Sequence, residues 1–190
     1  MDTIAYLQKQ FANLNNGLHG LANDLTADEW MARPIPGQNL IGFLAWHLPR
    51  TQDMFVQTWI RGETEVAHTD RWQGWKPLKE FGIGAGVTLE EADAIAHTVS
   101  KAEVLEYADE VYQTISDWLG ECGKDALEQC FDYHQRLAVF PEYQTPGFTR
   151  EVKHLFNRPV WDILMRPCTT HIYRHQGEIE VVKEMLRRPR

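Results

Sequence analysis

The sequence contains no apolar run close to the roughly 20 residues that a membrane-spanning helix needs. Its first residues, MDTIAYLQKQFANL, have an acid at the second position and lack the apolar core of a secretion signal. These absences argue against a membrane protein and predict a cytoplasmic location.

Basic residues are also scarce. Lys and Arg number 19 against 27 Asp and Glu, the net charge is −8, and the only basic cluster is the terminal LRRPR. A protein that grips phosphate backbones needs a basic stripe, which this sequence does not supply. We expect no nucleic-acid partner.

Cysteine is limited to Cys122, Cys130 and Cys168. Their odd number and the absence of a CxxC spacing argue against a disulfide framework and against a cysteine zinc site. We expect free thiols that are buried or incidental, in a reducing compartment.

Patterns of an α/β nucleotide-binding fold are missing as well. Gly82, Gly84 and Gly86 lie in a glycine-rich stretch, but their spacing is not GxGxxG and no strand pattern precedes them. No internal repeat is visible. These observations leave an all-α fold as the expectation.

Apolar residues at three- and four-residue steps predict four long helices. They cover residues 3–25, 39–62, 101–119 and 159–186, with Asn39 as the expected N-cap of the second and Pro49 as an expected local bend within it. Four long amphipathic helices in a chain of 190 residues predict a four-helix bundle, with residues 1–190 forming one domain.

The connecting segments are expected to hold short accessory helices and long loops. Three pairs have capping-box spacing and predict helix starts: Thr26 with Glu29, Thr88 with Glu91, and Ser100 with Glu103. Residues 63–87 are expected to be irregular. Residues 120–158 mix proline, glycine and aromatic residues, and we expect a helical turn followed by a loop or a short hairpin.

The segment HIYRH in the last helix places His171 and His175 four residues apart, so both imidazoles lie on one helix face. The chain has eight histidines. A random shuffle of such a sequence contains on average about one third of an HxxxH pair, so chance is a real explanation for one. The segment is not HExxH, because Ile172 stands in the second position, so a zinc-protease motif is excluded. The pair alone does not identify a metal site.

His47 lies on the apolar stripe of the second helix, as His171 and His175 do on theirs. Bundles build metal sites from inward side chains on facing helices, and three imidazoles leave coordination positions open for a substrate. The alternative is three buried, hydrogen-bonded core histidines, and periodicity leaves both open. The other five histidines are expected to face solvent or to be structural: His19, His68, His97, His134 and His154.

The sequence resembles the DinB/YfiT-like superfamily of metal-binding four-helix bundles. The resemblance rests on four pieces that together cover most of the chain: LTADEWMARPIPGQNLIGFLAWHLPRTQDMF, GAGVTLEEADAI, YADEVYQTISDWL and THIYRHQGEIEVVKEML. The most specific parts are WHLPRTQD and HIYRHQGEI. The family's metal triad takes one histidine from the second helix and two from the last, which implies His47, His171 and His175 as ligands here.

The resemblance further implies one divalent metal ion, with nickel or zinc common, and a homodimer. Some members use low-molecular-weight thiols such as bacillithiol or mycothiol. The first hypothesis is therefore a metal-dependent enzyme acting on a small molecule, either a thiol S-transferase or a hydrolase. The second is a non-catalytic, stress-responsive bundle that binds a metal or small ligand. A third possibility is that no metal binds.

Three further residues are candidates for supporting a metal site. Glu178, three residues after His175, is placed to orient an imidazole or to move a proton, or else is a solvated helix residue. Arg50 and Asp53 share the helix of His47 and are weaker candidates, with a surface ion pair as the plain interpretation. Three aromatic residues are expected to pack in the core rather than to line a pocket: Trp46, Trp161 and Tyr173.

Overall fold

The computed structural model of the chain describes residues 2–188. Within that range it is built from α-helices, 3-10 helices and two π-helical segments, and no strand occurs. The prediction of an all-α bundle with short accessory helices is confirmed.

The α-helices are α1 (Thr3–Ala22), α2 (Ala27–Trp30), α3 (Ile41–Asp53), α4 (Leu89–Thr98), α5 (Lys101–Glu121), α6 (Tyr133–Leu137), α7 (Pro146–Val152), α8 (Val160–Met165) and α9 (His171–Arg187). The 3-10 segments are Val66–His68, Asp70–Phe81, Lys124–Glu128, Pro141–Tyr143 and Lys153–Leu155, and the π segments are Met54–Arg61 and Arg166–Thr170.

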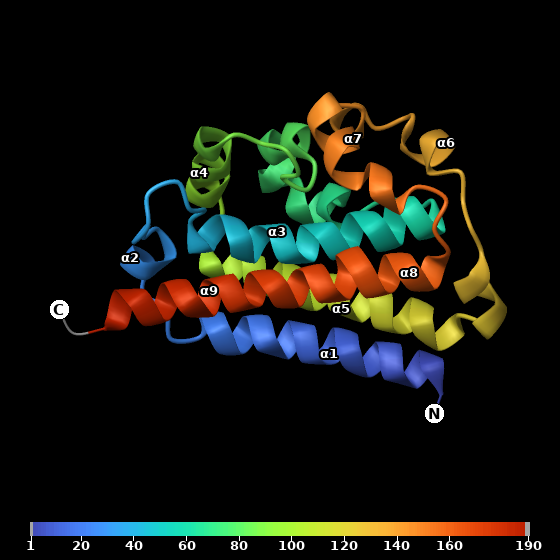
Figure 1. Cartoon of the computed structure of the whole chain (residues 1–190), viewed down its shortest axis with the longest axis horizontal. Coiled ribbons are helices and arrows are strands. Elements are labelled where there is room, and N and C mark those ends of the chain that lie inside the picture. The colour runs from blue at the N-terminus through green and yellow to red at the C-terminus, as the bar shows by residue number, and fades with distance from the viewer. Residues whose placement is uncertain (1, 189–190) are drawn as a thin grey trace.

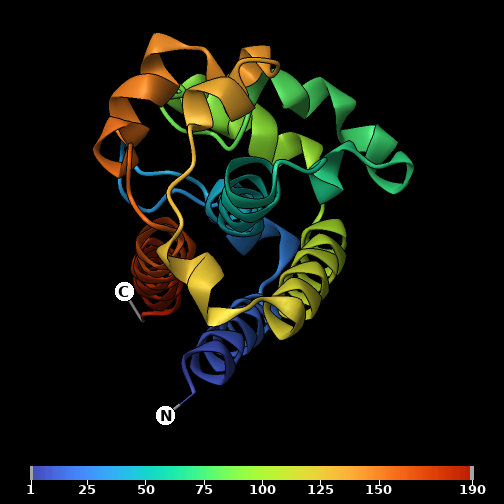
Figure 2. The same ribbon diagram turned by 90° about the vertical axis from the view of Figure 1, so that its right-hand side faces the viewer.

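The four long helices α1, α3, α5 and α9 run side by side (Figure 1). Seen nearly end-on in Figure 2, they form the four corners of a bundle, and a second layer that includes α4, α6 and α7 lies over α3. The prediction of a single inner stripe on the second helix was therefore incomplete. Every residue from 41 to 51 is buried, because neighbouring bundle helices and the upper layer enclose α3.

The helix starts follow the sequence signals closely. Thr26, Thr88 and Ser100 each accept a hydrogen bond from the backbone N–H three residues on, and all three capping boxes are formed. The N-cap prediction for the second helix was wrong by one residue: Leu40 takes the position, with no side-chain cap. The second helix ends at Gly62, the last residue of the range predicted for it.

Both helices that carry the histidine triad contain a π segment. The second helix continues beyond α3 as Met54–Arg61, and Arg136 donates to the terminal carbonyls of Trp59 (2.7 Å) and Ile60. The last helix begins after Pro159 and passes through Arg166–Thr170 between α8 and α9. Single π turns inside helices are frequent at functional sites.

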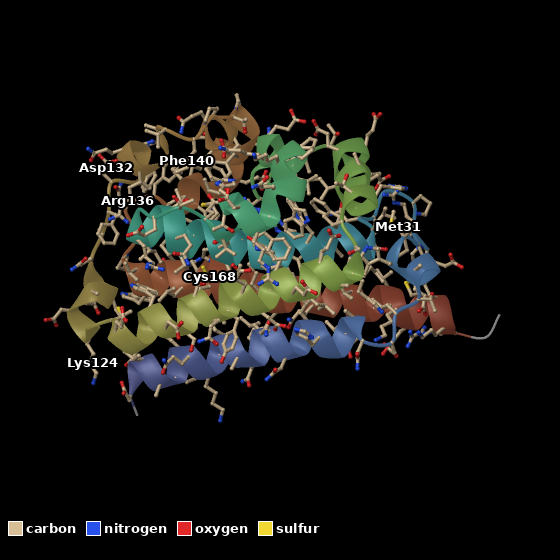
Figure 3. The ribbon with its side chains drawn as sticks, turned by 180° about the vertical axis from the view of Figure 1, so that it is seen from behind. Met31, Lys124, Asp132, Arg136, Phe140 and Cys168 are labelled. Atoms are coloured by element: carbon tan, nitrogen blue, oxygen red, sulfur yellow. The ribbon has the colours of Figure 1, made fainter. Side chains whose placement is uncertain are left out.

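The helical turn expected within residues 120–158 is present as Lys124–Glu128, but short helices follow it in place of the expected loop or short hairpin. This stretch forms short helices, and Pro141 and Pro146 open two of them. Proline favours the first turn of a helix because its missing N–H has no partner there. Figure 3 shows part of this region, around Asp132, Arg136 and Phe140, next to the end of the second helix. Residues 63–87, expected to be irregular, are largely 3-10 helix.

No helix in residues 2–188 is both long and apolar enough to cross a membrane. The three cysteines are free thiols: Cys130 is exposed, Cys122 half-buried and Cys168 fully buried. Figure 3 labels Cys168, which lies in the second π segment against the bundle core.

Candidate metal centre

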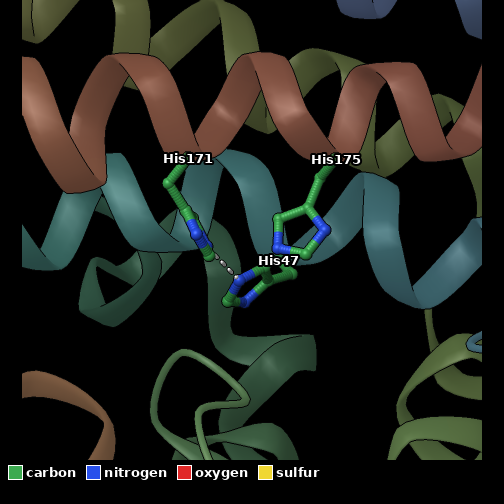
Figure 4. Close-up of side chains that lie close together, drawn as sticks. All are labelled: His47, His171 and His175. Carbon is green, nitrogen blue, oxygen red and sulfur yellow. Dashed lines mark hydrogen bonds between the residues drawn. The ribbon is translucent and has the colours of Figure 1, made fainter.

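His47 from α3 meets His171 and His175 from α9 (Figure 4). The Nε2 atoms of His47 and His171 are 3.0 Å apart, and one nitrogen from each ring lies within 4.8 Å of the other two. These three residues are the one group of candidate metal ligands found within residues 2–188. The structure brings together the three histidines that helical periodicity had selected.

The helices explain why the rings converge. His171 is the first residue of α9, directly after the π segment, and His175 follows one turn later on the same face. That face packs against α3, where His47 is 7% exposed. His175 is 8% exposed, and His171 is half-buried at the rim of a cavity.

Two of the imidazoles are held at the nitrogen that faces away from the cluster. Nδ1 of His47 donates to the carbonyl oxygen of Ile83 at 2.5 Å, and Nδ1 of His175 donates to Glu178 Oε2 at 2.6 Å. A neutral imidazole that donates from Nδ1 keeps a lone pair on Nε2. These partners therefore fix the tautomer that presents Nε2 as a ligand, as is usual around metal-bound histidines.

The environment also keeps the rings uncharged. Burial, together with the neighbouring His175, lowers the pKa of His47 to about 4. Burial and the other two histidines lower the pKa of His171 to about 3. Burial lowers the pKa of His175 as well, against the opposing effect of Glu178. Metal ligation requires neutral imidazole, the form that these lowered pKa values favour at neutral pH.

The loop that holds His47 was missed by sequence reasoning. Ile83 lies between Gly82 and Gly84, in the glycine-rich stretch whose spacing argued against a nucleotide-binding loop. Gly84 has φ +82° and lies so close to Phe43 that an added Cβ would come within 2.9 Å of its ring. Closely spaced glycines can mark a backbone that approaches other groups tightly, which was the usable signal.

The structure corrects the interpretation of Arg50 and Asp53 as a surface ion pair. Neither is on the surface, with exposed fractions of 2% and 0%, and neither bonds to the triad. They form a buried network with Glu65: Arg50 Nη2 lies 2.7 Å from Glu65 Oε2, and Arg50 Nη1 lies 3.2 Å from Asp53 Oδ2. Arg50 also donates to the carbonyl of Gly82 at 3.1 Å. The network therefore anchors the loop residue next to Ile83.

The network has two further members and a distinctive charge state. Tyr107 and Tyr143 each place a hydroxyl 3.1 Å from Arg50. Burial and the nearby Glu65 raise the pKa of Asp53 to about 6. Burial alone would raise the pKa of Glu65 too, but Arg50 and His68 hold it below its ordinary value.

The predictions for the aromatic residues are confirmed in part. Trp46 is buried in the core as expected, whereas Trp161 and Tyr173 are 43% and 40% exposed, so their core placement was wrong. His154 is exposed, as expected, and it also lines the same cavity as the triad. A lone histidine in a segment without periodicity offered no signal for this.

The triad opens onto a cavity of about 630 Å³. One wall is the loop of residues 82–87, called the glycine loop below. The other walls come from α3, from α7 with the following 3-10 turn, and from the second π segment leading into α9. Apolar and polar side chains line it in similar number, and four charged or titratable side chains join the triad around it: Glu151, His154, Arg166 and Arg174. A cavity of this size suits a small molecule.

The donor set fits a divalent transition metal. Nitrogen ligands on one tetrahedral ion at about 2.1 Å lie roughly 3.4 Å from each other, and the His47 and His171 nitrogens are already at 3.0 Å. Imidazole nitrogens suit transition metals such as zinc, copper, iron and nickel better than calcium or magnesium, which prefer oxygen. Three protein ligands beside a cavity leave room for a further ligand from outside.

Residues 10–152 match the family model described as the DinB superfamily. This range covers more than half of the chain and includes His47, whereas His171 and His175 lie beyond its end. No curated protein matches the chain.

Proposed function

The chain belongs to the DinB superfamily, and from this membership and the three-histidine cluster we propose that it is a divalent-metal-dependent enzyme acting on a small molecule. The reaction is either S-transfer from a low-molecular-weight thiol to an electrophile or hydrolysis. His47, His171 and His175 are the proposed ligands, and nickel or zinc is the proposed ion.

The observation that carries this proposal is the open side of the cluster. Structural zinc sites are closed by four protein ligands, whereas catalytic sites keep a position for water or substrate. Here three histidines group together, and all three line the cavity. This arrangement favours catalysis over the alternative of a non-catalytic metal-binding bundle.

When bound, a divalent ion would supply Lewis acidity, which lowers the pKa of a thiol or water. The chain's own residues prepare the site for it. Ile83 and Glu178 hold the His47 and His175 rings through Nδ1, and burial keeps the imidazoles neutral. The side chain of Glu178 is 40% exposed, so its carboxylate has access to solvent for moving a proton.

We further propose that residues 1–190 form a single domain that works in the cytoplasm as a homodimer. One continuous core with contributions from every long helix supports the single domain. The homodimer and its compartment are expectations from the family resemblance and the cysteine content.

The test is metal analysis of protein purified without a His-tag, followed by activity assays. Small thiols are offered with chlorodinitrobenzene for transfer, and nitrophenyl acetate is offered for hydrolysis, with His171→Ala as the control. We expect about one ion per chain and turnover that the variant loses. A stoichiometric ion without turnover above the variant would favour the non-catalytic bundle. Less than about a tenth of an ion after nickel or zinc is offered would overturn both interpretations.

A further inference from the structure

Two arginines close in sequence to His171 and His175 line the wall of the cavity. Arg166 opens the π segment that precedes α9, and Arg174 directly precedes His175. Both line the cavity, as does Thr170, which lies midway between them in the sequence. We propose that this wall is an anion subsite and that the substrate carries a carboxylate bound there, an inference that rests on the proposed function of the triad.

Arg166 is positioned but only partly used. Its Nε donates to Asp162 Oδ1 at 2.9 Å, and Asp162 is buried, which fixes the base of the guanidinium. Within residues 2–188 no hydrogen bond engages its two terminal nitrogens. A planar guanidinium with both terminal N–H groups free is the geometry that binds a carboxylate through two parallel hydrogen bonds.

Arg174 places a second positive charge beside the triad. Its Nη2 donates to Nε2 of His175 at 3.2 Å, the lone pair that a metal ion would take. Its Nε lies 3.5 Å from Glu178 Oε1. A divalent cation at the histidines would repel this guanidinium, and an anion between the two relieves that repulsion. The anionic group of the substrate is thereby held next to the ligand nitrogens.

The cavity lining as a whole carries one carboxylate against two guanidinium groups. Glu151 is the one carboxylate among the lining residues, against the two arginines, and it pairs with Arg150 at 3.5 Å. Its side chain is 54% exposed, close to the 57% of Arg166 and the 64% of Arg174. In a chain of net charge −8, the lining therefore has an excess of positive side chains. Phe43, Val152 and Leu155 give an apolar surface for the body of the substrate. A compact apolar molecule with one carboxylate matches these features.

Benzoate and its neutral counterpart benzamide are suitable probes, because they share an apolar ring and differ in charge. Binding of each is measured by calorimetry to zinc-loaded wild type, to Arg166→Gln and to Arg158→Gln. Arg158 is the matched control: it reaches the same Asp162, at 3.8 Å, but does not line the cavity. Circular dichroism and metal content confirm that the variants remain folded and loaded.

We expect benzoate to bind wild type more tightly than benzamide does, and Arg166→Gln to lose about tenfold or more in benzoate affinity. Arg158→Gln is expected to bind benzoate as wild type does, and Arg166→Lys to retain part of the affinity. Equal binding of the two probes, or equal losses in the two glutamine variants, would overturn the anion subsite.

The same titrations separate this inference from the proposed function. Should the protein take up no zinc, the metal proposal fails, and the titration is run on the metal-free protein. Benzoate binding that depends on Arg166 there would still support the subsite, and its absence would overturn it. Should zinc bind without a preference for benzoate, only the subsite fails.

Discussion

The buried ion network behind the triad offers a sharp test of how the glycine loop is held. Replacing Arg50 with Met removes the guanidinium and keeps much of the side-chain volume. Asp53 and Glu65, both 0% exposed, then lose their cation, and the carbonyl of Gly82 loses its donor. Removing one partner of a buried ion pair costs about 3–5 kcal/mol of unfolding free energy, because the remaining charge stays buried and unpaired.

The assay is urea and thermal unfolding of the metal-free protein. For a chain of this length each kcal/mol shifts the melting temperature by about 2–4 °C, so Arg50→Met is expected to melt roughly 6–20 °C lower than wild type. The double variant Arg50→Met with Glu65→Gln is expected to recover part of this loss, because it removes one of the stranded charges.

Arg71→Met is the matched control. Arg71 also pairs with two carboxylates, Glu106 at 3.3 Å and Glu110 at 3.4 Å, but its side chain is 58% exposed. Exposed pairs contribute about 0–1 kcal/mol, so this variant is expected to unfold close to wild type. If Arg50→Met cost no more than Arg71→Met, the network would not be a stabilising anchor, and the reasoning would be refuted.

Three further outcomes are expected. Glu178→Ala frees the His175 ring and lowers metal affinity about 10–100-fold in a competition titration, and an unchanged affinity would deny Glu178 an orienting role. A saturating ion at about 100 times its dissociation constant adds roughly 2.7 kcal/mol, or about 5–10 °C in melting temperature, which EDTA reverses. Without metal, the unfolded chain protonates His47 near pH 6.5 and the folded chain only near 4. Stability therefore falls as pH drops through this window, by up to about 3 kcal/mol; a His47→Asn variant with the same slope would contradict this.

The convergence of the triad could be predicted because helical geometry is local. Periodicity placed His47 on the inner face of one helix and His171 and His175 on the inner face of another, and adjacent helices of a bundle bring such faces together. The capping boxes were equally readable, since each depends on residues three apart. Long elements and their inward faces were therefore recoverable from the sequence.

The partner of His47 could not be predicted in the same way. The carbonyl of Ile83 is a backbone group that every residue possesses, so no side chain announces it. The burial of Arg50 and Asp53 depended on Glu65 and Tyr143, which are distant in sequence, so two charged residues three apart on a helix suggested a surface pair. Such contacts arise from tertiary packing that local patterns do not encode.

Composition was ambiguous in residues 120–158. Proline and glycine among aromatic residues are compatible with a hairpin turn and with the starts of short helices. Pro141 and Pro146 became helix starts because the short helices pack their apolar residues, such as Tyr143 and Phe148, onto the layer above α3. Trp161 and Tyr173 show the converse, since a large aromatic residue on a helix need not face inward.

The most direct test of the central claim is the number of metal ions bound per chain in four alanine variants. His47→Ala, His171→Ala and His175→Ala each remove one proposed ligand, and His154→Ala is the control that changes the same cavity outside the cluster. We predict about one nickel or zinc ion per chain in wild type and in His154→Ala, and loss of that ion in each of the other three. Full occupancy in any of those three, or an equal loss in His154→Ala, would contradict a metal centre built from these histidines.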